Sequence, residues 1–183
     1  MKRFICSSAV VFLLTHLFTA AWAAEVVIPD AALKSVIWHT LGRPPPAGTL
    51  TEQDMLSLTT LNANSKGVKD LEGLGAAHNL TALLLAYNQL TNLALPTGLT
   101  RLINLELSFN QLTTLTLPDW LTNLTGLFLS DNQLTSLTLP DGLTSLTGLF
   151  LSDNQLTSLT LPAGLTNLTR ACHELCWRKV CTR

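Results

Sequence analysis

A segment of 22 residues recurs along most of this 183-residue chain, and the recurrence constrains the fold more than any other feature. Copies begin at residues 80, 102, 124 and 146, and each reads L-x-x-L-x-L-x-x-N-Q-L followed by T-x-L-x-L-P-x-x-L-T. One copy is too short to bury its own leucines, so its stability has to come from neighbouring copies stacked against it. The chain is therefore expected to form a coil in which each repeat makes one turn.

The spacing of the leucines predicts how each turn is built. In L-x-x-L-x-L the leucines alternate with other residues, so a short strand points leucines inward and the intervening residues outward. The pattern and its length resemble those of leucine-rich repeats. This resemblance implies an α/β solenoid, a right-handed coil with a parallel β-sheet on its concave side and a small helical cap at the N-terminus. Aromatic residues make up only 6% of the chain, which suits a core made mainly of leucine.

An asparagine follows the predicted strand in every copy, where the chain is expected to turn. Its amide can pair with backbone groups of the bend that would otherwise be buried without partners. A ligand-binding role is the alternative, and a framework role is favoured because one amide recurs at each turn. The predicted structural ladder consists of Asn88, Asn110, Asn132 and Asn154.

Residues 1–23 differ from the rest and are predicted to be a signal peptide. Lys2 and Arg3 precede a long apolar run, and Ala21-Trp22-Ala23 supplies the small residues that a signal peptidase reads. An uncleaved membrane anchor is the alternative, because the run is nearly long enough to span a bilayer. Cleavage would leave no membrane span in the mature chain. We therefore expect a secreted or extracytoplasmic protein, in the periplasm or on the cell surface.

Residues 24–57 do not repeat and are predicted to form the helical N-terminal cap. Asp30 is a good N-cap for a helix over residues 31–41, and Thr51 with Asp54 forms a capping box for a second short helix. The solenoid is predicted over residues 58–169. It starts with a degenerate repeat at 58, continues with the four full repeats and ends with a partial one at 168.

Residues 170–183 are predicted to be a basic, cysteine-containing tail outside the repeat pattern. Leucine is expected at 171 and 173, where the chain has Ala171 and His173. The abrupt loss of the repeat favours a truncated or frame-shifted end over an evolved cap. Thiolate and imidazole suit zinc, but the spacing matches no familiar ligand module, so a tail with one chance disulfide and no metal is preferred. The candidate ligands are Cys172, His173, Cys176 and Cys181.

Features outside the repeats make the resemblance more specific. An isoleucine-proline-aspartate start at residues 28–30 is followed by a helix ending in Leu41-Gly42, a proline-rich loop and the segment Asp70-Leu71-Glu72-Gly73-Leu74. Over about residues 26–169 the chain resembles secreted bacterial leucine-rich-repeat proteins of the internalin-like type. The resemblance implies an extracytoplasmic protein that recognises other proteins, and it identifies no particular ligand.

The outward positions of the predicted strands form two columns along the concave face. Exposed aromatic side chains on a rigid sheet are common anchors of protein interfaces, and an apolar patch there calls for an explanation. The alternative is that these side chains only cover strand edges. We predict ligand binding by a first column of Leu84, Glu106, Phe128 and Phe150, and a second of Tyr87, Phe109, Asp131 and Asp153.

The signal peptide, the resemblance and these columns together predict an exported module for protein–protein recognition. Its partner is a protein of unknown identity, which could be a host or cell-surface protein. A net charge of −1 offers no basic surface for nucleic acid. Three histidines lie beyond residue 23, and none belongs to a recognised catalytic motif. We therefore predict that the protein is not an enzyme, uses no cofactor and binds no metal. Asp131 and Asp153 could together hold calcium, but with no third ligand they are interpreted as a solvated edge.

Two other functions remain open at this stage. The chain could be a structural spacer or a fragment of a larger surface protein, which its abrupt end favours. Hydroxyl residues on the opposite, convex face resemble the threonine arrays of ice-binding proteins, although this array is short. Its files are Thr114 with Thr116, Ser136 with Thr138, and Ser158 with Thr160. Three Asn-Leu-Thr triplets, at residues 79, 123 and 167, match the glycosylation acceptor pattern but arise from the repeat itself.

Overall fold

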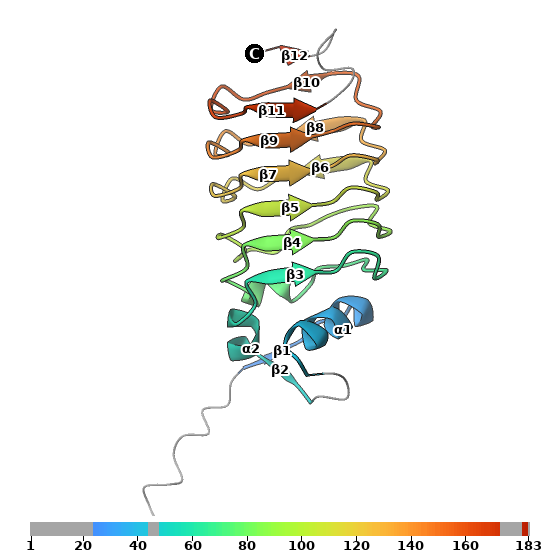
Figure 1. Ribbon diagram of the computed structural model, residues 1–183, viewed down its shortest axis with the longest axis vertical. Coiled ribbons are helices and arrows are strands. Elements are labelled where there is room, and N and C mark those ends of the chain that lie inside the picture. The colour runs from blue at the N-terminus through green and yellow to red at the C-terminus, as the bar shows by residue number, and fades with distance from the viewer. Residues whose placement is uncertain (1–23, 44–47, 173–180, 183) are drawn as a thin grey trace, which may run out of the picture.

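The computed structural model of the protein describes residues 24–43, 48–172 and 181–182 as a solenoid of stacked turns (Figure 1). The predicted signal peptide and most of the predicted tail lie outside these residues. Two helices and two short strands precede the coil, in the order β1 (Glu25–Val26), α1 (Ala31–Thr40), β2 (Leu50–Thr51) and α2 (Glu52–Leu56). The coil itself contains β3 (Thr60–Asn62), the 3-10 helix η1 (Leu74–Ala76), β4 (Ala82–Leu84), β5 (Asn104–Glu106), β6 (Thr114–Thr116), β7 (Gly126–Phe128), β8 (Ser136–Thr138), β9 (Gly148–Phe150), β10 (Leu159–Thr160), β11 (Arg170–Cys172) and β12 (Cys181–Thr182).

One strand from each turn joins a six-stranded parallel sheet in the order β3-β4-β5-β7-β9-β11. From β3 to β9 the central leucine of each strand pairs with the leucine 22 positions away, as in Leu61 with Leu83 and Leu105 with Leu127. These leucines are fully buried, so the residues on either side of them face outward. The predicted leucine-rich-repeat solenoid is confirmed. We call the outward side of this sheet the sheet face.

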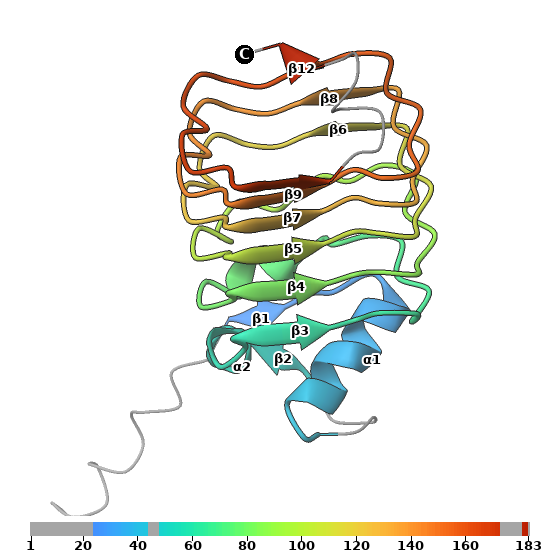
Figure 2. The same ribbon diagram turned by 45° about the horizontal axis from the view of Figure 1, so that its top comes forward.

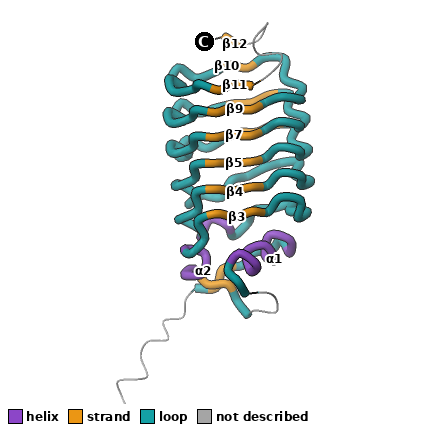
Figure 3. The backbone as a smooth tube through the Cα atoms, in the orientation of Figure 1, coloured by secondary structure: helices purple, strands orange, loops and turns teal. Residues whose placement is uncertain are grey.

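The chain returns on the far side of the coil through further short strands (Figure 2). There β6 pairs with β8 and β10 pairs with β12, all in parallel. Most of each turn between the two sides is loop (Figure 3). Leucines from both sides meet in one continuous core, and burying each one contributes about 1.5–3 kcal/mol.

The asparagine after each sheet strand is held by backbone groups of its own turn and of the turn before. The Asn110 amide nitrogen donates to the carbonyls of Leu85 and Leu107, both at 3.0 Å, and its oxygen accepts from the N–H of Leu90 at 3.1 Å. Asn132 and Asn154 repeat this pattern one and two turns later. The amides thus supply partners for bends that are cut off from water.

Two further ladders of side-chain hydrogen bonds run along the coil. The repeat pattern alone did not predict them. The amides of Asn79, Asn123 and Asn167, from the Asn-Leu-Thr triplets, donate to carbonyls of the preceding turn at 2.8–2.9 Å. The hydroxyls of Thr81 and Thr147 donate to the residue 22 positions before them. These side chains tie neighbouring turns together at the bend that leads into the sheet.

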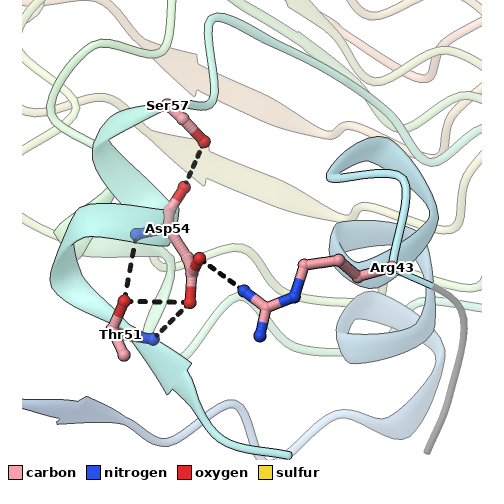
Figure 4. A network of polar contacts seen from close by, with 4 residues as sticks. All are labelled: Arg43, Thr51, Asp54 and Ser57. Atoms are coloured by element: carbon pink, nitrogen blue, oxygen red, sulfur yellow. Dashed lines mark hydrogen bonds and ion pairs between the residues drawn. The ribbon is translucent and has the colours of Figure 1, made fainter. Parts of the chain in front are cut away.

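The cap is joined to itself by a small polar network (Figure 4). The predicted capping box is present: Thr51 Oγ1 accepts from the N–H of Asp54, and the Asp54 carboxylate accepts from the N–H of Thr51. Arg43, just past α1, forms an ion pair with Asp54 at 2.6 Å and lies 4.9 Å from the ring centroid of Trp38. This network holds the two helices together at the end of the core.

The Asp30 carboxylate joins the cap to the first turn. One oxygen accepts from the N–H of Leu33 and caps α1, while the other accepts from the N–H groups of Lys69 and Asp70. Gly73, which departs from the repeat pattern, lies beside this junction with φ of 84°. A Cβ there would lie 2.1 Å from the carbonyl oxygen of Val27, so only glycine fits.

The sheet continues one strand further than the repeat pattern suggested. The repeat pattern predicts that residues 170–172 belong to the non-repeat tail, yet they form β11 and pair with β9 in register. The N–H groups of Thr169 and Arg170 both donate to the carbonyl of Thr147 at 3.0 Å. A parallel ladder needs only backbone groups, so losing the leucines does not prevent this strand from pairing.

Replacing Asn110 with alanine is expected to lower the free energy of unfolding by about 2–4 kcal/mol, because it leaves several buried backbone groups without partners. Urea denaturation followed by circular dichroism measures the change. Asn92→Ala, at an exposed position on the return segment, is the matched control and should cost less than about 0.5 kcal/mol. An unchanged unfolding midpoint for Asn110→Ala contradicts the framework role.

Asp30→Asn is expected to destabilise the protein near neutral pH and much less in acid. Burial raises the pKa of Asp30, but hydrogen bonds from the N–H groups of Leu33, Lys69, Asp70 and Ala32 outweigh it and hold the pKa below its usual 3.8. A carboxylate with a lowered pKa stabilises the fold above its unfolded value, and this contribution is lost as pH falls through the folded pKa.

Urea midpoints of wild type and Asp30→Asn, compared near neutral pH and at about pH 3, test this linkage. The gap between the two proteins should narrow in acid. The exposed Asp119→Asn change serves as the control, and its midpoint should stay close to that of wild type at both pH values. A gap of the same size at both pH values contradicts the role of the Asp30 charge.

Candidate functional site

The sheet face carries a central column of outward side chains, one from the last residue of each sheet strand from β3 to β9. The strand pairing sets Leu84 beside Glu106, Glu106 beside Phe128 and Phe128 beside Phe150, as the repeat predicted. The column starts one turn earlier with Asn62. Neighbouring members are about 4.8 Å apart, the spacing of paired strands.

A second column, here called the turn column, lies three residues further along each turn. All its members have left-handed backbone conformations, with φ between 55° and 58°. Aspartate tolerates this region, but bulky side chains rarely adopt it and pay about 1 kcal/mol or more. The column nevertheless has aromatic residues on two neighbouring turns, so packing stability does not explain their choice. Its members are Ser65, Tyr87, Phe109, Asp131 and Asp153.

The four aromatic residues form two stacked pairs on different columns. Tyr87 and Phe109 stack in the turn column with ring centroids 4.1 Å apart and an interplanar angle of 7°. Phe128 and Phe150 stack in the central column at 4.8 Å and 2°. The aromatic surface therefore crosses from one column to the other between the turns that begin at residues 102 and 124.

The two pairs are exposed to different extents. The side chain of Phe128 lies over Gly126 of the same strand, where an added Cβ would lie 2.9 Å from the ring. Phe150 covers Gly148 in the same way, and both rings are half-buried as a result. Tyr87 and Phe109 remain 58% and 40% exposed. The two phenylalanines expected to form the exposed patch are therefore the less exposed pair. Tyr87 and Phe109 are the more exposed pair.

Acidic side chains lie beside the aromatic rings in both columns. Glu106 precedes Phe128 in the central column, and its carboxylate accepts from the N–H of Ser108 at 2.8 Å. Asp131 and Asp153 follow Phe109 in the turn column. Among the residues that the structure describes, no three histidine, cysteine, aspartate or glutamate side chains gather in a way that could hold a metal ion. His173 and Cys176 of the tail lie outside those residues.

The hydroxyl array lies on the opposite side of the coil. Thr114 and Thr116 of β6 pair with Ser136 and Thr138 of β8, and all four side chains are exposed. They form a two-strand patch that contacts none of the aromatic pairs.

Comparison with known proteins agrees with this architecture. A family model described as leucine-rich repeats in two copies matches residues 122–163. Internalin H of Listeria monocytogenes serovar 1/2a is 35% identical over 91 residues, which is 50% of this chain and 17% of that protein. The chain carries leucine-rich repeats and is similar to internalins.

Solved structures show the same fold. The crystal structure of an internalin, InlF, from Listeria monocytogenes matches this chain with a TM-score of 0.62 and 23% identity, over 85% of this chain and 60% of that one. The functional domain of InlJ from the same species, which includes a cysteine ladder, matches with a TM-score of 0.61 and 26% identity, over 79% and 36%. This chain thus spans less than two thirds of each of these relatives. No helix within the described residues is long and apolar enough to cross a membrane.

Gly126→Ala is expected to displace the Phe128 ring while keeping the fold. The new Cβ would meet only side-chain atoms, the Phe128 ring at 2.9 Å and Asn104 Oδ1 at 2.7 Å, and both can move. The loss in unfolding free energy should stay below about 1.5 kcal/mol, and the nuclear Overhauser contacts between the Phe128 and Phe150 rings should weaken.

Gly75→Ala is the matched comparison, because its Cβ would lie 2.5 Å from the backbone oxygen of Thr97. That variant should lose at least about 2 kcal/mol. Equal stability of the two variants, or intact ring contacts in Gly126→Ala, contradicts the view that glycine makes room for the ring.

Proposed function

We propose that this internalin-like protein is a binding module that recognises a protein partner through its sheet face. The aromatic residues of the turn column carry the proposal. Tyr87 and Phe109 occupy left-handed positions that disfavour them, stack on each other and still expose about half of their surface. A residue retained against local preference on a rigid, exposed face is better explained by contact with a partner than by packing.

The chemistry of the face suits a protein ligand. Two stacked aromatic pairs supply broad, rigid apolar contact at low cost in side-chain entropy, while Glu106 and the two aspartates supply polar contacts around them. The sheet is held by its ladders and core, so the face is ordered before it binds. The proposed activity is recognition without catalysis.

The proposed location is outside the cytoplasm. It is supported by the Lys2–Arg3 start, the apolar run and the Ala21-Trp22-Ala23 site, and by the likeness to internalins. A host or cell-surface protein is the corresponding class of partner.

Ligands for the face can be selected from a displayed random-peptide library on the immobilised protein. Two double variants test the two aromatic pairs: Tyr87→Ser with Phe109→Ser, and Phe128→Ser with Phe150→Ser. At least one of them is expected to weaken binding of the selected peptides at least about 30-fold, since two anchor residues are worth about 2 kcal/mol or more. Isothermal titration calorimetry measures the change, and circular dichroism checks the fold.

The control is Thr116→Ala with Thr138→Ala, on the opposite side of the coil, which should leave the affinity unchanged. Peptides whose affinity is indifferent to both aromatic pairs but falls in the threonine variant would move the binding site to the other face. Enrichment of no peptide that depends on either aromatic pair contradicts the proposal.

A further inference from the structure

A groove of about 490 Å³ lies where the cap meets the first turn of the coil. One wall is α1, with Ser35, Val36 and His39, and the other is the first turn, with Asn62, Asn64 and Lys66. These two walls come from parts of the chain more than twenty residues apart, and α1 packs directly against β3. The groove exists only because the cap and the coil are joined.

The groove continues the proposed binding face. Asn62 lines it and is also the first member of the central column, paired in register with Leu84. A segment lying along that column from Phe150 toward the cap therefore reaches the groove at its end.

The amide groups in the groove are held in one orientation. Asn64 Oδ1 accepts from the N–H of Ala86 at 2.8 Å, and Asn62 Oδ1 accepts from the N–H of Asn64 at 3.1 Å. Both amide oxygens are thus used by the backbone. Within the described residues neither NH₂ group has a protein acceptor, so both remain as donors.

The groove also holds one ammonium and one imidazole. Lys66 and His39 line it, and none of the described lining residues is a carboxylate. Two carboxylates of the cap are already bound elsewhere, Asp30 by backbone N–H groups and Asp54 by Arg43. An ammonium, an imidazole and two amides without a matching acceptor suit an anion with two oxygens.

We infer that this groove receives the carboxylate of an aspartate or glutamate side chain from the protein segment bound on the sheet face. The inference rests on the proposed function and adds the chemistry and direction of its ligand. Asp131 and Asp153 lie toward the other end of the face and disfavour an acidic residue there. The acidic end of the segment therefore lies at the cap.

The spacing of the turns defines the ligand further. Phe128 and Phe150 lie three and four strands from β3 in the sheet. At about 4.8 Å per strand, the rings are about 14–19 Å from the groove. An extended segment advances about 3.3 Å per residue, so its acidic residue lies about four to six positions from the residue that contacts the phenylalanines.

The groove can be tested alone with blocked glutamate, N-acetyl-glutamate methylamide, and its uncharged isostere N-acetyl-glutamine methylamide. Titrated into the full nitrogen-15-labelled protein, the glutamate probe should shift the side-chain NH₂ signals of Asn62 and Asn64 and the glutamine probe should not. Lys66→Gln should weaken glutamate binding at least about threefold, because one charge-assisted contact is lost. Lys69→Gln, an equal loss of charge outside the groove, should not. Equal shifts with both probes, no shift with glutamate, or equal effects of the two lysine variants overturn the inference.

The selected peptides separate this inference from the proposed function. Peptides that need Phe128 and Phe150, carry an acidic residue at the expected spacing and bind Lys66→Gln about tenfold more weakly support both. Peptides that need the phenylalanines but show no acidic residue and no response to Lys66→Gln overturn the inference and leave the proposed function standing. Peptides indifferent to both aromatic pairs overturn the proposed function, whatever the probes show at the groove.

Discussion

The packing of leucines between successive turns is the interaction on which the rest of this structure depends. A single turn has no interior of its own, and Leu83 or Leu105 becomes buried only when the turns before and after are in place. At the N-terminal end the cap takes the place of a neighbouring turn, because Leu33, Ile37 and Met55 pack into the same core as the first turn. The stability of each turn therefore depends on its neighbours, and a destabilising change in one turn also destabilises the turns beside it.

Close packing of turns brings their bends together, and bends carry backbone groups that need partners. The asparagine and threonine ladders meet this need with side chains placed once per repeat, such as Asn110 and Thr147. Because these groups and the leucines account for the framework, the outward residues are free to differ between turns. That freedom allows Glu106 in one turn and Phe128 in the next at the same position.

The sequence predicted the framework and the columns well because both follow from a fixed period. Once Leu83, Leu105 and Leu127 point inward, the residues beside them must face outward in register. The lean of Phe128 over Gly126 was not predictable, since it depends on the rotamer chosen over a missing side chain. Nor was the groove between His39 and Lys66, which arises from the angle at which the cap docks and has no periodic signal. The strand at residues 170–172 was missed because backbone pairing there proceeds without the leucine pattern.

The near identity of the turns that begin at 124 and 146 has a consequence for how such a chain can evolve. Gain or loss of one whole 22-residue unit preserves every contact type between neighbours, because each new junction has the same form as the old one. What changes is the separation between the cap and the aromatic rings, in steps of about 4.8 Å. The number of repeats therefore sets the distance between the groove at the cap and the aromatic rings. Adding or removing a repeat could fit these two proposed contact points to ligands of different length while leaving both unchanged.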